Sequence, residues 1–300
     1  YLDSLPKDVE HPDTACIALA GPVENGFCKL TNLGWEINKQ ELINRTNITN
    51  IEIINDFSVL IYGLPHLEKS QYVELQADKF KNGIRSRVAI VGAGTGLGIA
   101  RGLITDENII SIPSEGGHTE FSPSTLTEWD IYNWIKKDMK LSRVSKERVV
   151  SGTGLGNIAK WRLSLPDAKG HPLKNICDTS TEHMKPFNKD FPAIVSEEAN
   201  KGDSVMKEVI NIWLHAYGSA AGDIALHELC TGGLWIAGGT ASKQLPGLKS
   251  KVFIEAFRNK GRFNKFLKKI RVCAITDNEV GLFSAGCKAK HLVKSNEKMN

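Results

Sequence analysis

Short apolar stretches alternate with turns and helical stretches along the first part of the chain. Thr14–Ala20 is an apolar run that ends at Gly21-Pro22, and Ile48–Ile54 is an isoleucine-rich run that ends at Asn55-Asp56. Their lengths and residue types predict two strands. Between them, Asn38–Asn44 has the spacing of a helix. Strand, helix and strand in this order predict a βαβ unit with parallel strands.

A glycine-rich link joins two further predicted strands, Arg87–Val91 and Ile99–Thr105. The link is Gly92-Ala-Gly94-Thr95-Gly96-Leu-Gly98. It lacks the GxGxxG spacing of a dinucleotide-binding loop, because Leu97 stands at the third glycine position, and a strand pattern follows where a helix is needed. We therefore predict a β-hairpin whose turn offers backbone N–H groups and the Thr95 hydroxyl to an anion. A purely structural turn is the alternative.

The rest of the chain carries helical patterns separated by two buried strands, Gly233–Gly239 and Val272–Ile275. Pro166–Phe191 mixes Pro, Asp, Lys, Asn and His, and we expect it to be irregular. Apolar residues at helical spacing predict helices over Thr127–Lys140, Leu155–Leu163, Asp203–Leu229, Val252–Phe266 and Gly281–Val293. The pattern as a whole is that of a mixed α/β chain.

Length and composition narrow the class of protein. A chain of 300 residues predicts two domains, and 41% hydrophobic with 24% charged residues excludes wholesale disorder and coiled coil. The longest uncharged apolar stretches, Val88–Ala100 and Leu229–Ser242, are rich in glycine and shorter than the roughly 18 apolar residues that a membrane span needs. We therefore predict no membrane association.

Charge and cysteine usage exclude two further kinds of site. Residues 249–271 hold nine bases and one acid, which fits a nucleic-acid patch, a solvated helix face or a cationic rim near a polyphosphate ligand. No nucleic-acid-binding motif accompanies this charge, so we predict no nucleic acid partner. The six cysteines lie apart, without CxxC or CxnH spacing. This pattern predicts reduced thiols in a cytoplasmic protein and no metal site.

Several polar groups stand where ligands bind in α/β proteins. Asp56 directly follows a predicted strand, where a carboxylate can accept the proton of an alcohol that attacks phosphorus; an Asx turn or helix cap made by Asn55-Asp56 is the alternative. Glu115-Gly-Gly-His118 can direct a carboxylate and an imidazole into one cleft, although a lone histidine is more often structural. Gly238-Gly239 ends a strand where a flat adenine or ribose could lie, and a strand-end turn explains it equally well.

Taken together, these segments resemble the bacterial-type ATP-dependent glucokinases of the hexokinase/actin-like superfold, over nearly the whole chain. The motifs that carry the resemblance are Ala18-Leu-Ala-Gly21-Pro22, Leu30-Thr-Asn-Leu-Gly-Trp35, Ile53-Ile-Asn-Asp-Phe57, the glycine-rich link, Pro113-Ser-Glu-Gly-Gly-His118, Glu147-Arg-Val-Val-Ser-Gly152, Ile236-Ala-Gly-Gly239, Lys260-Gly-Arg-Phe263 and Gly281-Leu-Phe-Ser-Ala-Gly286. Each motif is modest alone, but their order and spacing together are specific.

The resemblance implies a two-lobed actin-like ATPase fold of the ribonuclease H type, with mixed sheets flanked by helices. It implies a small lobe of residues 1–66 plus 277–300 and a large lobe of residues 67–276, with glucose and MgATP in the cleft between them. It also implies a cytoplasmic homodimer. The reaction that it implies is transfer of a phosphoryl group from MgATP to glucose, giving glucose 6-phosphate and ADP.

The resemblance also implies roles for individual residues. Asp56 is the expected base for the sugar 6-hydroxyl, and Asn55, Glu115, His118 and Glu147 are expected to bind sugar hydroxyls. The residues expected at the nucleotide are Gly92, Gly94, Thr95, Gly96, Gly238 and Gly239.

One departure from the family leaves an alternative open. The family opens with a hairpin bearing an Asp-x-Gly-Gly-Thr-Asn loop that contacts the ATP phosphates, and nothing in Tyr1–Asp13 resembles it. We expect that the sequence was cut before this point. If the loop is truly absent, a non-catalytic sugar-binding regulator on the same fold becomes the alternative. A nucleotide-dependent dehydrogenase is a weaker one.

Overall fold

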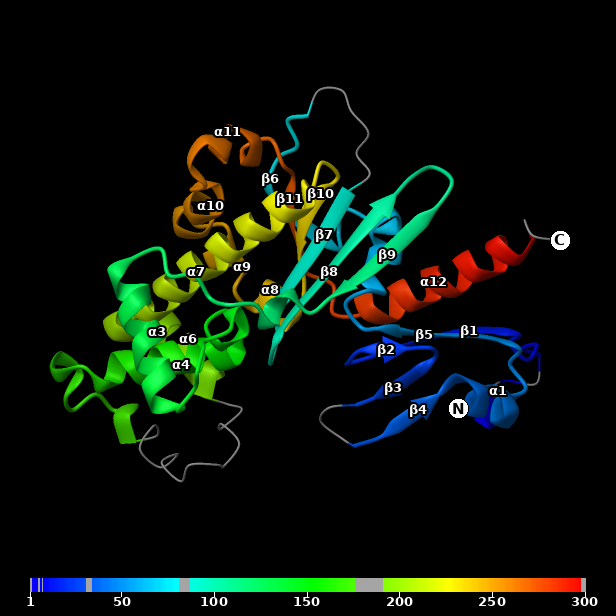
Figure 1. The fold of residues 1–300 in the computed structure, drawn as a ribbon, viewed down its shortest axis with the longest axis horizontal. Coiled ribbons are helices and arrows are strands. Elements are labelled where there is room, and N and C mark those ends of the chain that lie inside the picture. The colour runs from blue at the N-terminus through cyan, green and yellow to red at the C-terminus, as the bar shows by residue number, and fades with distance from the viewer. Residues whose placement is uncertain are drawn as a thin grey trace.

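A six-stranded sheet with helices on both sides lies beside a smaller group of elements that contains the N-terminal strands (Figure 1). The computed structural model describes residues 2–4, 6, 8–30, 34–80, 87–175 and 191–297. The mixed α/β class that the sequence predicts is confirmed.

The six-stranded sheet is mixed in direction. Its strands lie in the order β6-β11-β10-β7-β8-β9. Strand β10 runs parallel to both β7 and β11, while β6, β8 and β9 pair antiparallel with their neighbours. The bounds are β6 (Tyr72–Gln76), β7 (Arg87–Ala93), β8 (Leu97–Ile104), β9 (Ile109–Ser114), β10 (Gly233–Ile236) and β11 (Val272–Ile275). The predicted hairpin around the glycine-rich link is therefore confirmed as β7–β8.

The N-terminal elements form two small sheets. Strand β1 (Thr14–Leu19) pairs parallel with β5 (Asn50–Asn55), which confirms the predicted parallel pairing. The connection between them holds helix α1 (Lys39–Thr46), and also a three-stranded antiparallel sheet that the sequence did not predict. Its strands are β2 (Val23–Glu24), β3 (Phe27–Lys29) and β4 (Glu36–Asn38). Strands of two or three residues are too short to show a pattern of alternation.

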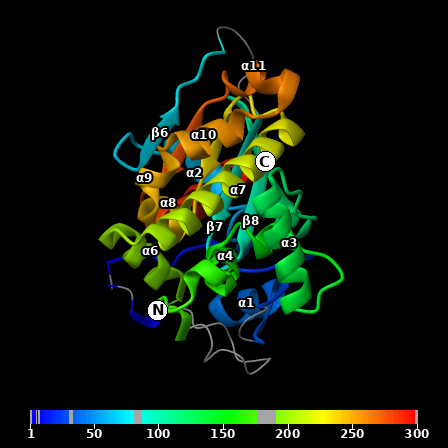
Figure 2. The same ribbon diagram turned by 90° about the vertical axis from the view of Figure 1, so that its left-hand side faces the viewer.

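The remaining helices cover both faces of the large sheet. Their bounds are α2 (Leu60–Gly63), α3 (Leu126–Asp138), α4 (Gly152–Ser164), α6 (Phe191–Lys201), α7 (Ser204–Glu228), α8 (Gly239–Lys243), α9 (Leu245–Leu248), α10 (Lys251–Arg258), α11 (Asn264–Leu267) and α12 (Val280–Glu297). Single 3-10 turns lie at Leu2–Ser4, Leu64–His66, Gly116–His118, Lys146–Arg148, Pro166–Ala168 and Gly261–Phe263. Figures 1 and 2 place α7 and α10 on one face of the sheet, and Figure 1 places α12 on the other.

One predicted helix was wrong, and two strands of the large sheet were missed. The helix predicted over Val252–Phe266 is two helices, because the chain turns between α10 and α11 at Gly261, whose φ of 52° lies in the left-handed region. Strands β6 and β9 were not predicted, and α6 begins at Phe191, the last residue of the stretch that we expected to be irregular. Residues 176–190 of that stretch, including Cys177, lie outside the described residues.

Strand β7 is buried on both faces and supports the site described below. Ala89 and Val91 point into the large core with Trp213 and Tyr217 of α7. The intervening residues, Val88 and Ile90, belong instead to the core beneath α2. A central strand packed on both faces is an apolar run without alternation.

The C-terminal helix joins the two ends of the chain. Helix α12 packs against β1 and α2. This contact supports, as a proposal, the division into a small lobe of residues 1–66 plus 277–300 and a large lobe of residues 67–276.

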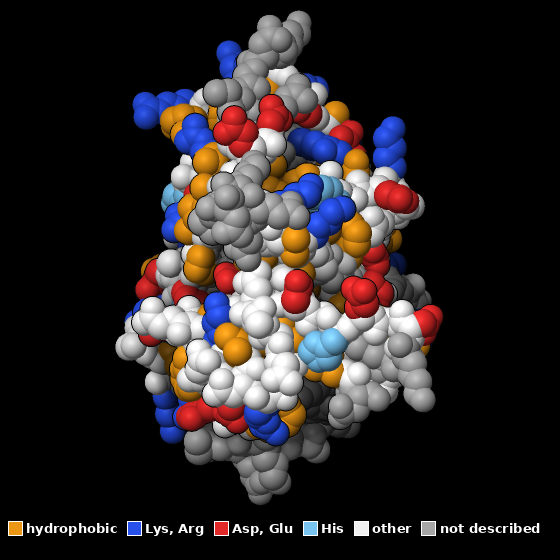
Figure 3. Space-filling model, turned by 90° about the vertical axis from the view of Figure 1, so that its right-hand side faces the viewer, with side chains coloured by type: hydrophobic (Ala, Val, Ile, Leu, Met, Phe, Trp, Pro, Cys, Tyr) orange, Lys and Arg blue, Asp and Glu red, His pale blue; other side chains and the backbone are white. Residues whose placement is uncertain are grey.

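The surface charge, the helices and the cysteines can be compared with the kinds of partner and site that the sequence excluded. On the face drawn in Figure 3, basic and acidic side chains of the described residues are interspersed and form no continuous basic stripe. Among the described helices, none combines the length and apolar composition needed to cross a membrane. The five described cysteines are free thiols. No group of three or more His, Cys, Asp or Glu side chains within the described residues could hold a metal ion.

Candidate functional site

Most of the candidate residues lie where strands end. Asn55 and Asp56 close β5, the turn at Gly94–Gly96 follows β7, Glu115 follows β9, and Gly238 follows β10. Strands β7, β9 and β10 run in the same direction, because β8 is antiparallel to both β7 and β9 while β10 is parallel to β7. Their carboxyl ends therefore meet at one edge of the large sheet, which is where ligands bind in α/β folds.

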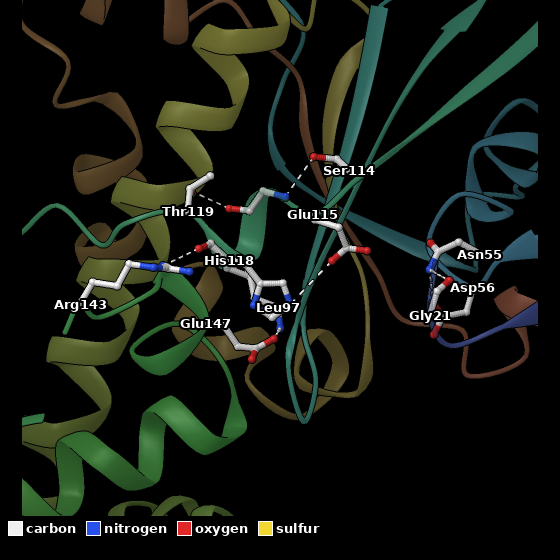
Figure 4. A network of polar contacts seen from close by, with 11 residues as sticks. Gly21, Asn55, Asp56, Leu97, Ser114, Glu115, His118, Thr119, Arg143 and Glu147 are labelled. Atoms are coloured by element: carbon white, nitrogen blue, oxygen red, sulfur yellow. Dashed lines mark hydrogen bonds and ion pairs between the residues drawn. The ribbon is translucent and has the colours of Figure 1, made fainter. Parts of the chain in front are cut away.

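Asn55 shapes the turn that holds Asp56. Its Oδ1 accepts hydrogen bonds from Phe57 N at 3.0 Å and Ser58 N at 3.1 Å. Its Nδ2 donates to Gly21 O at 3.2 Å and to Asp56 Oδ1 at 3.1 Å. The Asx turn that the sequence left open as an alternative is thus present. It also fixes the Asp56 carboxylate and ties it to the end of β1 (Figure 4).

Phe57, which sequence reasoning missed as a site residue, joins Asp56 to the glycine hairpin. Its ring occupies the space that side chains at Gly92 and Gly98 would need. A Cβ on Gly92 would lie 2.6 Å from the ring, and one on Gly98 would lie closer still. The two outer glycines of the hairpin are therefore sites of close packing for Phe57. By contrast, a Cβ on Gly94 would meet nothing within 4 Å.

Glu115 and His118 come together as the Glu-Gly-Gly-His motif predicts. Glu115 Oε2 lies 3.7 Å from His118 Nε2, and both side chains are more than half exposed. The 3-10 turn between them is held by Gly116 N, which donates to Ser114 Oγ at 3.2 Å. Arg143 Nη1 donates to His118 O at 2.7 Å. Figure 4 shows Glu115 between His118 and the Asn55–Asp56 pair.

Glu147 reaches the hairpin from the 3-10 turn at Lys146–Arg148. Its Oε2 accepts a hydrogen bond from Leu97 N at 3.0 Å. A Cβ on Gly96 would lie 2.5 Å from this same oxygen, so the contact requires glycine there. The structure therefore brings Glu147 to the hairpin that also contacts Phe57, beside His118 (Figure 4).

The turn of the hairpin is closed by Gly94 N, which donates to Gly96 O at 2.8 Å. Thr95 lies at its tip, and its carbonyl accepts a hydrogen bond from Thr153 Oγ1 at 2.9 Å. On the other side, Thr240 Oγ1 donates to Ala93 O, next to Gly238 and Gly239. Thr153 and Thr240 are further residues that the sequence alone did not single out, since hydroxyl bonds to backbone carbonyls leave no motif.

A cavity lies elsewhere, between α12 and the loop that joins β8 to β9. It has a volume of about 1510 Å³ and is lined by residues such as Ile104, Ile109, Leu282, Phe283 and Lys290. It contains none of the candidate residues and lies at the opposite end of β8 from them.

The environment of Asp56 raises its pKa above the ordinary aspartate range. Burial is the main cause, and the nearby Glu115 carboxylate adds to it. Hydrogen bonds from Phe57 N, from its own N–H and from the Asn55 side chain oppose this shift. The sequence predicts that Asp56 is a base. If so, its raised pKa means that it becomes protonated at a higher pH than an ordinary aspartate, and the acidic side of the pH–rate profile reports its ionisation.

We expect Glu115→Gln to move the acidic limb of the kcat/KM profile to lower pH. The substitution removes a negative charge that disfavours ionised Asp56, so the pKa of Asp56 falls. The measurement is kcat/KM against pH, with Glu120→Gln as the matched control, because Glu120 accepts a hydrogen bond from Tyr132 Oη at 2.6 Å and is not among the groups that shift the pKa of Asp56. An acidic limb that stays in place in Glu115→Gln contradicts the assignment.

The family model described as Glucokinase matches residues 1–292. A glucokinase of Nostoc sp. (strain PCC 7120) is 37% identical over 287 residues, covering 94% of this chain and 83% of its own length. A glucokinase of Yersinia enterocolitica is 32% identical over 288 residues, covering 95% of this chain and 81% of its own length.

Solved structures give the same result for the fold. The crystal structure of a glucokinase from an Antarctic psychrotroph matches with a TM-score of 0.75 and 29% identity, covering 93% of this chain and 81% of its own. A glucokinase from Balamuthia mandrillaris in complex with glucose matches with a TM-score of 0.72 at 19% identity, covering 92% of this chain and 78% of its own.

Proposed function

The chain belongs to the glucokinase family and phosphorylates glucose, and we propose that it transfers the γ-phosphoryl group of MgATP to the 6-hydroxyl. The products are glucose 6-phosphate and ADP. The observation that carries this proposal is the position of Asp56, a carboxylate of raised pKa held at the end of β5 and joined through Phe57 to the glycine hairpin.

Asp56 is proposed as the general base. As the sugar O6 attacks the γ-phosphorus, the proton of the 6-hydroxyl passes to the Asp56 carboxylate. The O6–P bond forms while the bond from the γ-phosphorus to the bridging oxygen breaks, and ADP leaves with that oxygen. The Mg²⁺ ion arrives with the nucleotide as part of the substrate, where it neutralises phosphate charge.

Glu115, His118 and Glu147 are proposed to bind the sugar hydroxyls. Carboxylates accept hydrogen bonds from hydroxyls, and an imidazole can donate or accept. Asn55 is proposed to bind a neighbouring hydroxyl as well. Because its amide already bonds to four backbone or side-chain atoms, its larger contribution is to hold Asp56 in position.

The nucleotide is proposed to lie along the turn of the hairpin and the end of β10. Gly94, Thr95 and Gly96 are assigned to the phosphates, and Gly238 and Gly239 to the adenosine. Gly92 was predicted to lie at the nucleotide with these residues. In the structure, the Phe57 ring and Ala237 O occupy the space that a side chain at Gly92 would need. We therefore propose that Gly92 acts by admitting this packing. A cytoplasmic location and a homodimer complete the proposal and rest on the family alone.

The proposed function is tested by ATP consumption with a panel of hexoses. We expect ADP to form with glucose, and glucose 6-phosphate to appear in equal amount. Incubation without sugar is the control for ATP hydrolysis. Sugar binding without transfer to any hexose would contradict the proposal and favour the non-catalytic regulator.

A further inference from the structure

The segment Glu147–Thr153 holds the turn of the glycine hairpin by three hydrogen bonds, and we call it the clamp segment. Leu97 N donates to Glu147 Oε2 at 3.0 Å. Gly152 N donates to Gly94 O at 2.7 Å, and Thr153 Oγ1 donates to Thr95 O at 2.9 Å. The turn has one bond of its own, from Gly94 N to Gly96 O. The β7–β8 ladder reaches the base of the turn at Ala93 and Leu97, and the clamp segment adds three bonds to the turn itself.

The clamp segment is itself rigidly anchored in the large core. Fully buried Ser151 donates to Glu147 O at 2.7 Å and accepts from Gly154 N at 2.8 Å, which caps α4. Trp213 Nε1 donates to Ser151 O at 3.0 Å. A segment fixed in this way can transmit a restraint at one end to the other, because it has little freedom to adjust.

The same segment also borders the sugar-binding residues. Lys146, just before it, donates its N–H to Thr119 O at 2.9 Å, which joins it to the turn that carries His118. Glu147 uses Oε2 for Leu97 N, and within the described residues no hydrogen-bond donor contacts its Oε1. Glu147 thus holds the hairpin through Oε2 (Figure 4), and in the proposed site its Oε1 is the oxygen left to accept a hydrogen bond from a sugar hydroxyl.

We propose that the clamp segment couples the binding of sugar and nucleotide, with Thr153 as a positioning residue; this rests on the proposed function. A hydroxyl bound to Glu147 Oε1 restrains the carboxylate, and its Oε2 then fixes Leu97 N and the turn at Gly94–Gly96. Thr153 holds the tip of that turn in register. Each substrate thus raises the affinity for the other by the same factor, as linkage requires.

The test measures the Kd of a non-hydrolysable ATP analogue by calorimetry, with and without saturating glucose. In the wild type we expect glucose to tighten binding by about 5- to 150-fold. Thr153→Val keeps the shape of the side chain and removes the hydroxyl, and should lower this ratio by about three- to tenfold. Thr153→Ser retains the hydroxyl and should restore it. Thr105→Val is the matched control, because Thr105 Oγ1 donates to Asn108 O in the remote β8–β9 loop.

The outcomes separate the coupling from the catalytic proposal. Suppose that the wild-type enzyme turns over glucose. The coupling alone is then overturned if glucose tightens analogue binding equally in the wild type and in Thr153→Val, or does not tighten it in the wild type at all. The coupling is also overturned if Thr105→Val weakens the effect of glucose on analogue binding as much as Thr153→Val does, since the effect would then not belong to the clamp segment. Wild-type enzyme that fails to turn over glucose contradicts the proposed function instead. Thermal melts of each variant establish that the proteins compared are folded.

Discussion

Asp56→Asn is expected to lower kcat with glucose and ATP by about 10²–10⁴-fold, while the affinity for glucose largely survives. Asparagine retains the size of the side chain and an oxygen that can accept from Asn55 Nδ2, but it cannot take the proton of the 6-hydroxyl. Steady-state kinetics with glucose give kcat, and calorimetry gives the sugar affinity. A variant with near-normal kcat would exclude Asp56 as the base.

Stability gives an independent check on the same variant. The folded state raises the pKa of Asp56, so the ionised form is less favourable there than in the unfolded chain. The resulting cost is fully present above the folded-state pKa and disappears below the unfolded-state pKa. Asp56→Asn should therefore have a higher Tm than the wild type near neutral pH, with the difference shrinking as the pH falls through the raised pKa. A fall in Tm at neutral pH would show that the carboxylate is stabilised where it lies.

Gly98→Ala is expected to lower kcat by about 10²-fold, the second-largest effect, although Gly98 is assigned no contact with substrate. Its new Cβ would enter the space of the Phe57 ring and displace the turn that carries Asp56. A shift of the base by about 1 Å can cost this much, because the chemistry depends on alignment. Kinetics at a temperature well below the Tm measure the effect.

Two variants complete this test. Gly286→Ala is the matched control, since a Cβ there meets nothing within 4 Å and the residue lies in α12, at the remote cavity. Phe57→Ala removes the ring from the same slot. If both substitutions act through this contact, their effects on kcat will be far from additive in the double variant. Simple additivity would mean that Gly98 and Phe57 act separately.

The parts of the fold that the sequence predicted are those with strong local signals. The parallel pairing of β1 and β5 follows from two apolar runs with a helix between them, and α4 follows from the helical spacing of apolar residues over Leu155–Leu163. Strand β9 was missed because it lies at the edge of the sheet, with a half-exposed surface and Pro113 within it. Strand β6 also lies at an edge, where burial imposes little pattern.

The same distinction between strong and weak local signals applies to the residues of the site. Asp56, Glu115 and His118 could be named beforehand because they stand in motifs with charged or polar side chains, and Glu147 could be named through the resemblance to the family. The partners that position them could not. The Leu97 N–H and the Thr95 carbonyl are backbone groups that every residue carries. That Phe57 rests on Gly92 and Gly98 depends on β5 lying against the hairpin, which only the packing of the two parts of the chain determines.

The strand order of the large sheet also bears on how the protein is made. Strand β7 pairs with β8 on one side, which follows it at once, but on the other side it pairs with β10, which is synthesised only after α7. Until then, a nascent chain leaves one edge of this buried central strand without a partner, and such an edge can pair with other chains. Because Gly238 and Gly239 follow β10, the proposed nucleotide site is also among the last parts of the molecule to be synthesised and assembled.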